Sequence, residues 1–198
     1  MAKLFAFGDS FTYGYELSDC PTNTYPVHSL LTYSALTAKH FNYEYVCCAE
    51  GFASNNKISK FIRHADISKD DLALVMWTFT DRYSFMFSGS RGDRTVGHED
   101  KWWHTLIDHK TEQRFERTID HILSAHHVLN KVGCRYLFLC NNLELQKEIQ
   151  YNKHIDIDKW VFLSNDSKML NYSNAHPGDE AHKDVFNIIK ERLDGRNR

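Results

Sequence analysis

A serine near one end of the chain and a histidine near the other are of the types that carry nucleophilic catalysis. Ser10 directly follows the apolar run Leu4-Phe5-Ala6-Phe7 and lies in the segment Gly8-Asp9-Ser10-Phe11-Thr12-Tyr13-Gly14. A serine where a strand meets a turn can expose its hydroxyl while nearby backbone N–H groups converge on one point. That arrangement suits a nucleophile beside an oxyanion hole. The same residue types also form ordinary turns, so the segment alone leaves both interpretations open.

His176 lies in a Pro-Gly loop immediately before the last predicted helix, where it can overhang the ends of the strands. Neutral imidazole, whose ordinary pKa is about 6.5, can accept the proton of a serine hydroxyl. The chain has 12 histidines, so the residue type alone does not select this one. His182, inside the predicted helix, is expected to contribute packing or a contact on the helix surface.

Two more polar segments follow predicted strands. Gly51 lets the backbone approach a ligand closely, and Asn55 can donate a side-chain N–H, although this stretch also reads as a turn and a helix cap. The hydroxyl of Thr80 can reach the same place. Asp81 and Arg82, which follow it, can form a salt bridge at the rim of the site.

Apolar runs alternate with helical patterns along the chain, which is typical of a parallel sheet covered by helices. The predicted strands are residues 4–7, 43–48, 72–77, 136–140 and 160–163. The predicted helices run from Pro26 to about residue 40, from a cap at Ser54 or Asn55, and over 112–131, 143–149 and 179–193. This order predicts an α/β protein with a three-layer αβα sandwich and a parallel sheet of about five strands. Ligands of such sheets bind beyond the carboxyl ends of the strands, where the polar segments lie.

Residues from 81 to about 111 break this alternation and are interpreted as a long insertion in a single domain that spans residues 1–198. Segments of this length inside compact domains are usually lids or binding loops, or are disordered. The adjacent Trp102 and Trp103 favour an ordered lid with apolar walls.

Composition excludes several classes of protein. The 24 Lys and Arg residues nearly balance 26 Asp and Glu residues, which argues against nucleic-acid and anionic-membrane partners. No apolar run approaches the length of about 18 residues that a membrane span needs, and the N-terminal run is too short for a signal peptide. The five cysteines include no C-x-x-C pair, and an odd count suits a reducing compartment. The sequence therefore predicts a cytoplasmic protein and leaves its oligomeric state open.

The Gly-Asp-Ser segment after the first strand, combined with a late His-Pro before the last helix, resembles the GDSL-type SGNH hydrolases. The overall character is similar to small members of that family from tailed-phage genomes. The resemblance implies a flavodoxin-like αβα fold and serine-dependent hydrolysis of a small-molecule or glycan ester, with an acyl or acetyl group on a carbohydrate as the first expectation. It implies no cofactor and no metal.

The resemblance also implies a role for each matching residue. Ser10 is expected to be the nucleophile and His176 its general base. The backbone N–H groups of Ser10 and the Gly51 loop are expected to form the oxyanion hole, with Thr80 or Asn55 assisting. The expected walls of the substrate pocket are Asp9, Phe52, Trp102 and Trp103.

Two positions depart from the family pattern. The third block of the family ends in Gly-x-Asn-Asp, and Thr80 replaces its Asn, which normally completes the oxyanion hole. The last block carries an Asp three residues before the His, and Ser173 takes that place. Ser173, Asn174 or Asp179 can orient the ring of His176 in its stead, or a backbone carbonyl can do so in a Ser-His dyad.

Three alternative functions compete with this interpretation. Six histidines in the middle third raise the question of a metal site, but none stands in a tight ligand spacing such as H-E-x-x-H. Neither G-x-G-x-x-G nor G-x-x-x-x-G-K-[ST] occurs, which argues against dinucleotide and P-loop binding. The two departures favour a third alternative, a catalytically weakened fold of this type that serves as a binding or structural module.

Overall fold

The computed structural model describes residues 1–20, 27–86, 93–96, 111–163 and 176–195. At its centre is a five-stranded parallel sheet in the order β2-β1-β3-β6-β7. The strands are β1 (Lys3–Gly8), β2 (Glu44–Ala49), β3 (Leu72–Trp77), β6 (Arg135–Cys140) and β7 (Trp160–Phe162). All five were predicted from the sequence. Because β1 and β3 are neighbours near the middle, the segments that follow them leave the sheet side by side.

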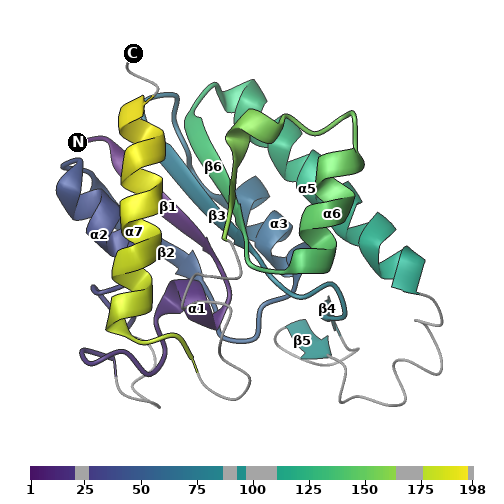
Figure 1. Ribbon diagram of the computed structural model, residues 1–198, viewed down its shortest axis with the longest axis horizontal. Coiled ribbons are helices and arrows are strands. Elements are labelled where there is room, and N and C mark those ends of the chain that lie inside the picture. The colour runs from purple at the N-terminus through teal and green to yellow at the C-terminus, as the bar shows by residue number, and fades with distance from the viewer. Residues whose placement is uncertain (21–26, 87–92, 97–110, 164–175, 196–198) are drawn as a thin grey trace.

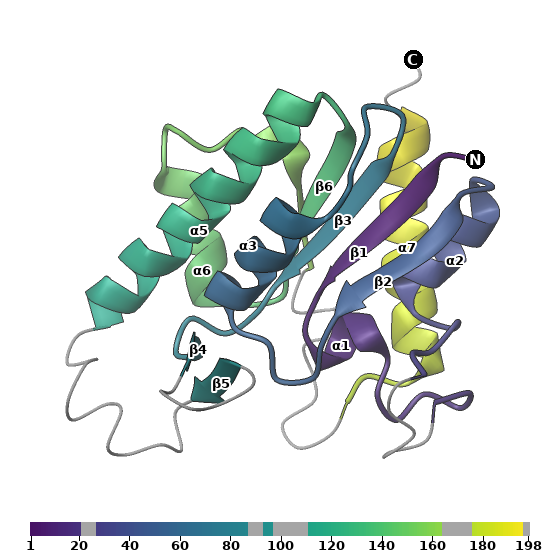
Figure 2. The same cartoon turned by 180° about the vertical axis from the view of Figure 1, so that it is seen from behind.

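Helices cover both faces of this sheet (Figures 1 and 2). The helices on one face are α2 (Tyr33–His40) and α7 (Asp179–Asp194), and those on the other are α3 (Asn55–His64), α5 (Thr111–Val132) and α6 (Leu143–Tyr151). The short helices are α1 (Ser10–Tyr13) and the 3-10 turn η1 (Ile157–Lys159). The three-layer αβα class is thereby confirmed. Among the helices of the described ranges, none is both long and apolar enough to cross a bilayer.

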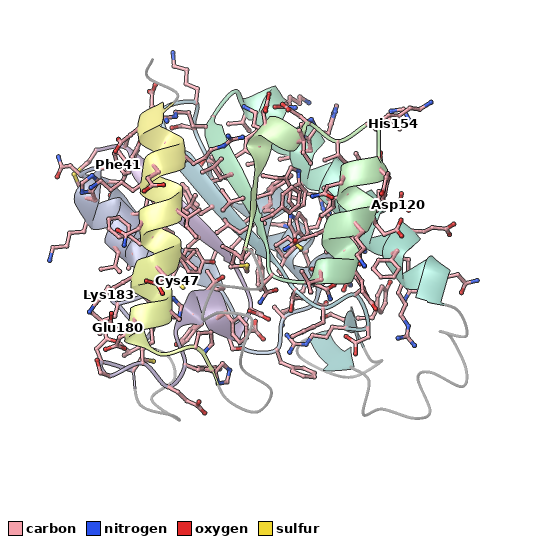
Figure 3. All side chains as sticks on the ribbon, viewed as in Figure 1. Phe41, Cys47, Asp120, His154, Glu180 and Lys183 are labelled. Atoms are coloured by element: carbon pink, nitrogen blue, oxygen red, sulfur yellow. The ribbon has the colours of Figure 1, made fainter. Side chains whose placement is uncertain are left out.

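Each strand supplies both hydrophobic layers, because successive side chains of a strand point to opposite faces. In β1, Phe5 and Phe7 enter the core beneath α3 and α5, while Leu4 and Ala6 enter the core beneath α2 and α7. Strand β3 is buried along its whole length, as expected for a central strand covered on both faces. Figure 3 shows the side chains that fill these layers.

The helix predicted from Pro26 to about residue 40 is shorter in the structure. Helix α2 begins only at Tyr33, with the side chain of Thr32 as its N-cap. Before it, the Asp19 carboxylate accepts a hydrogen bond from the Leu30 N–H at 2.8 Å and helps to hold the chain in an irregular conformation. The apolar residues between positions 27 and 32 therefore do not belong to a helix.

The predicted insertion at residues 81–111 contains an antiparallel pair of strands, β4 (Tyr83–Met86) and β5 (Asp93–Val96). The pair lies at the same end of the sheet as α1 (Figures 1 and 2). Trp102 and Trp103 fall outside the described residues. The ordered lid, and the single domain over residues 1–198, stay predictions.

Helix α7 is attached to α2 through His182, which is 1% exposed. Its ring is stacked on Tyr33 with the centroids 5.7 Å apart, and its Nδ1 accepts a hydrogen bond from the Tyr33 N–H at 3.2 Å. The Tyr33 hydroxyl lies 2.7 Å from Oγ1 of Thr12 in α1. The packing role expected for His182 is thus confirmed, and burial lowers the pKa of His182 to about 4.

We expect His182 to make the fold less stable in mild acid. The imidazole of an unfolded chain has a pKa of about 6.5, so between pH 6.5 and 4 the unfolded state binds a proton that the folded state excludes. The free energy of unfolding then falls as the pH falls, by about 2 kcal/mol between pH 7.5 and 5. Denaturant unfolding at these two pH values should show a smaller loss for His182→Gln than for the wild type. His64→Gln, at an exposed position, is the control, and an unchanged loss in His182→Gln would contradict the assignment.

Candidate active site

Ser10 begins α1 two residues beyond the end of β1 and is 7% exposed. Gly8 permits this abrupt turn, because a Cβ at that position would collide with the side chain of Thr12. Asp9 is the N-cap of α1, and its carboxylate accepts a hydrogen bond from the Phe11 N–H at 3.1 Å. Within the described ranges, the N–H of Ser10 donates to no acceptor, so it can serve an incoming oxyanion.

The Asp9 carboxylate joins the segments that follow β1 and β3. Its Oδ2 accepts hydrogen bonds from Oγ1 of Thr78 at 2.6 Å and from Nη1 of Arg82 at 2.8 Å. The side chain is 4% exposed and is ion-paired with Arg82. Both carboxylate oxygens are thus bound to protein groups that hold the turn in place. A place for Asp9 in the wall of the substrate pocket stays a prediction.

The Arg82 guanidinium lies between two aromatic rings, 4.6 Å from the centroid of Phe52 and 4.8 Å from that of Phe79. Phe52 adopts a left-handed backbone conformation with φ of 63°, which is unusual for a bulky residue. Both rings remain exposed, at 48% for Phe52 and 41% for Phe79. The cation is thus covered on two sides, and apolar surface is displayed at the carboxyl end of the sheet.

The Gly51 turn lies beside the start of α1. The Glu50 N–H donates to the Gly8 carbonyl at 3.3 Å, and the Ala53 N–H closes the turn on the Glu50 carbonyl at 3.1 Å. A Cβ on Gly51 would collide with the ring of Tyr15, so glycine allows the loop after α1 to pack against this turn. The structure therefore brings the segments of Ser10 and Gly51 together.

Asn55 has a different role from the predicted one. It is 2% exposed, its Oδ1 accepts from the Thr78 N–H at 2.9 Å, and its Nδ2 donates to the Thr78 carbonyl at 3.1 Å. The amide thus satisfies both backbone groups of Thr78, as a neighbouring strand would. The predicted oxyanion donor is corrected to a residue that fixes the segment after β3.

Thr80 lies in the next turn, which the Arg82 N–H closes on the Phe79 carbonyl at 3.4 Å. It is half-buried. Its role as an oxyanion donor stays a prediction. Thr78, which no sequence motif singled out, is the hydroxyl that contacts Asp9.

His176 lies over α1, so the two distant ends of the chain meet as the sequence led us to expect. The centroid of its ring is 5.8 Å from that of Phe11, the residue after Ser10, and 5.8 Å from that of Tyr15, with both rings edge-on. Its Nδ1 lies 3.4 Å from Oε2 of Glu16. The sharing of a proton between Ser10 and His176 stays a prediction.

Asp179, one of the groups expected to orient the imidazole of His176, binds elsewhere in the structure. Its carboxylate accepts hydrogen bonds from the hydroxyl of Ser18 at 2.6 Å and from the Ser18 N–H at 3.2 Å, and the bond from the hydroxyl is the main cause that lowers the pKa of Asp179. The carboxylate near His176 comes instead from Glu16, which the sequence analysis missed. Ser173 and Asn174 lie outside the described residues. Because Glu16 and His176 are far apart in sequence, no local pattern could have paired them.

No family model and no curated protein matches this sequence. Solved structures do match. A carbohydrate esterase aligns with a TM-score of 0.62 at 14% identity, over 98% of this chain and 68% of its own. A carbohydrate esterase family 2 enzyme with a carbohydrate-binding domain, from Corynascus thermopiles (Myceliophthora fergusii), aligns at 0.62 and 15% identity, over 100% and 67%. A protein described as a G-D-S-L family lipolytic protein from Desulfitobacterium hafniense aligns at 0.55 and 16% identity, over 98% and 100%.

These alignments cover nearly all of this chain. At such low sequence identities they show that the fold is shared. The architecture implied by the Gly-Asp-Ser segment and the late histidine is therefore the architecture that the chain has. It is the αβα fold of these carbohydrate esterases and of the G-D-S-L family protein.

The bond between Asp9 and Thr78 should be measurable in the free energy of unfolding. Thr78→Val keeps the shape and removes the hydroxyl donor, which we expect to cost about 1–3 kcal/mol because a buried charged acceptor loses a partner. In the Asp9→Asn background the same substitution should cost at least about 0.5 kcal/mol less. Denaturant titrations of the two single variants and the double variant provide the cycle. Strict additivity would show that the two side chains do not interact.

Proposed function

We propose that this protein is a serine-dependent ester hydrolase in which Ser10 is the nucleophile and His176 the general base. The position of the His176 ring against Phe11, directly after Ser10, carries the proposal. Both residues lie at the carboxyl end of a parallel sheet, where folds of this kind bind their ligands. The fold shared with carbohydrate esterases and with a protein described as a G-D-S-L family lipolytic protein gives independent support.

The reaction proceeds as a two-step acyl transfer. Oγ of Ser10 passes its proton to Nε2 of His176, the ring nitrogen not directed to Glu16, and attacks the ester carbonyl carbon. The carbon–oxygen bond to the alcohol then breaks, and the imidazolium protonates the leaving alcohol. Water next gives a proton to Nε2 of His176 while its oxygen attacks the acyl-serine carbonyl carbon. The bond from that carbon to Oγ of Ser10 then breaks, and the imidazolium returns its proton to Oγ as the acid leaves.

Negative charge on the carbonyl oxygen is stabilised in this proposal by the N–H groups of Ser10 and the Gly51 turn. Thr80 supplies a hydroxyl in place of the family's amide. One such donor is worth about 10²–10³ in rate, so a hydroxyl that must rotate into place is expected to give a slower enzyme than an amide held in place.

The ester is proposed to carry a short acyl group, with a carbohydrate as the first candidate for the alcohol. Phe52 and Phe79 offer exposed aromatic surface next to the Gly51 turn, and aromatic rings suit sugar faces as well as acyl chains. Trp102 and Trp103 are proposed as further walls. Two of the similar structures are carbohydrate esterases, which supports this substrate class.

A cytoplasmic site of action is part of the proposal. The five cysteines are free thiols, in keeping with a reducing compartment.

Burial raises the pKa of Cys140 to about 12 and that of Cys48 to about 11, so these thiols are protonated at neutral pH and are not candidates for the nucleophile.

A binding module is the second candidate. One of the similar structures is a carbohydrate esterase whose active site is described as having divergent catalytic and non-catalytic binding functions. The replacement of the family's Asn by Thr80 and of its Asp by Ser173 favours this alternative.

The two candidates are separated by esterase assays on p-nitrophenyl acetate and longer acyl esters. Ser10→Ala should reduce kcat/KM by at least about 10³, because removal of the nucleophile leaves only binding and oxyanion stabilisation. Ser68→Ala, in the turn before β3 at the opposite end of the sheet, is the matched control and should retain activity. A fluorophosphonate probe should label the wild type and Ser68→Ala but not Ser10→Ala. Equal turnover by the wild type and Ser10→Ala, with no labelling, would overturn the hydrolase and favour the binding module.

A further inference from the structure

We propose that Glu16 is the positioning carboxylate of His176, a role that rests on the proposed function of Ser10 and His176. One carboxylate oxygen, Oε2, reaches both parts of the histidine. It lies 3.4 Å from the ring Nδ1 and accepts a hydrogen bond from the His176 N–H at 3.2 Å. A single carboxylate oxygen therefore contacts both the ring and the backbone of His176, which limits how the ring can turn relative to its backbone.

The chemical consequence follows from which nitrogen the carboxylate approaches. A carboxylate at Nδ1 favours the tautomer that carries its proton there, which leaves the lone pair on Nε2 to accept the proton of Ser10. When the ring becomes an imidazolium, the negative charge of Glu16 stabilises it. Glu16 therefore both selects the basic nitrogen and stabilises the charge that forms.

The loop after α1 is built to present this carboxylate. Helix α1 ends at Tyr13, its C-cap Gly14 has a φ of 87° that reverses the chain, and Glu16 itself has a φ of 64°. Left-handed backbone at a residue other than glycine costs of order 1–3 kcal/mol and persists only where its surroundings hold it. Leu17, which is 1% exposed, anchors the loop in the protein.

A second contact fixes the loop against the segment that carries His176. Ser18 donates both its hydroxyl and its N–H to the Asp179 carboxylate. Glu16 and Ser18 thus bind residues three apart on the other segment. The loop and the start of α7 meet as one unit, and the distance between Glu16 and His176 depends on both contacts.

Other groups around the ring do not take this role. Its flanks are the aromatic rings of Phe11 and Tyr15. On α7, Asp179 is bound by Ser18, and Glu180, labelled in Figure 3 at the end of that helix, forms an ion pair with Lys183 at 2.6 Å. Of the described carboxylates near this loop, Glu16 is the one that the structure places at the imidazole.

The expected size of the effect follows from exposure. The side chains of His176 and Glu16 are 28% and 42% exposed, so water and salt weaken their attraction. Loss of a fully buried carboxylate in a serine-protease triad costs about 10⁴ in rate. For this half-exposed pair we expect about 10- to 100-fold in kcat, with KM changed less than about threefold because Glu16 does not bind the substrate.

The test compares Glu16→Gln with Glu180→Gln, which removes a carboxylate from the same region without touching the ring. Nitrogen NMR of the full chain, with the His176 signals assigned from a His176→Gln spectrum, reports which ring nitrogen carries the proton. We expect the Nδ1–H tautomer in the wild type and in Glu180→Gln, and a larger share of the Nε2–H tautomer in Glu16→Gln. The rates of fluorophosphonate labelling and of p-nitrophenyl acetate turnover should fall together in Glu16→Gln alone.

An unchanged tautomer together with unchanged labelling in Glu16→Gln would overturn the proposal. The result can be told apart from failure of the hydrolase itself. If wild-type turnover does not depend on Ser10, the proposed function fails, whereas the tautomer still decides whether Glu16 orients His176. A circular dichroism spectrum and an unfolding midpoint equal to those of the wild type show that Glu16→Gln is folded.

Discussion

The buried carboxylate of Asp9 is the contact on which the carboxyl end of this sheet depends. It caps α1 through the Phe11 N–H, accepts from Thr78 after β3, and balances the charge of Arg82. A carboxylate taken out of water is costly unless it is paired and fully hydrogen-bonded, and three donors meet that requirement here. Because these donors come from two chain segments, neither segment can shift without leaving a buried charge short of partners. The position of Ser10, the next residue, follows from this constraint.

The strands and helices of the sheet could be predicted because each one shows its own hydrophobic pattern within a short stretch of sequence. A strand buried on both faces reads as a continuous apolar run, as Leu72–Trp77 does, and α7 shows the periodicity of a helix with one buried face. The helix expected from Pro26 failed for an equally physical reason, since the side chain of Asp19 binds the backbone ahead of Thr32. Such competition between a side chain and a helix depends on a partner that periodicity does not reveal.

The site was predictable only in part, because a residue type does not say where its polar atoms point. The amide of Asn55 was expected to face a ligand and instead completes the backbone bonding of Thr78. Asp179 was expected near His176 and contacts Ser18, while Glu16 takes the place at the ring. The segments that follow β1, β2 and β3 do meet at one end of the sheet, as expected. Which of the polar side chains in these segments hydrogen-bonds to the protein, and which can act on a ligand, depends on how distant loops pack.

The distance along the chain between Ser10 and His176 has a consequence for biogenesis. Ser10 is synthesised before four of the five strands, and His176 follows only after all five have been made. At synthesis rates of about 5–20 residues per second, the stretch from Ser10 to His176 takes roughly 8–33 seconds to make. The docking of α7 on α2 therefore comes after the rest of the sheet is available, and the segments of Ser10 and His176 can meet only then.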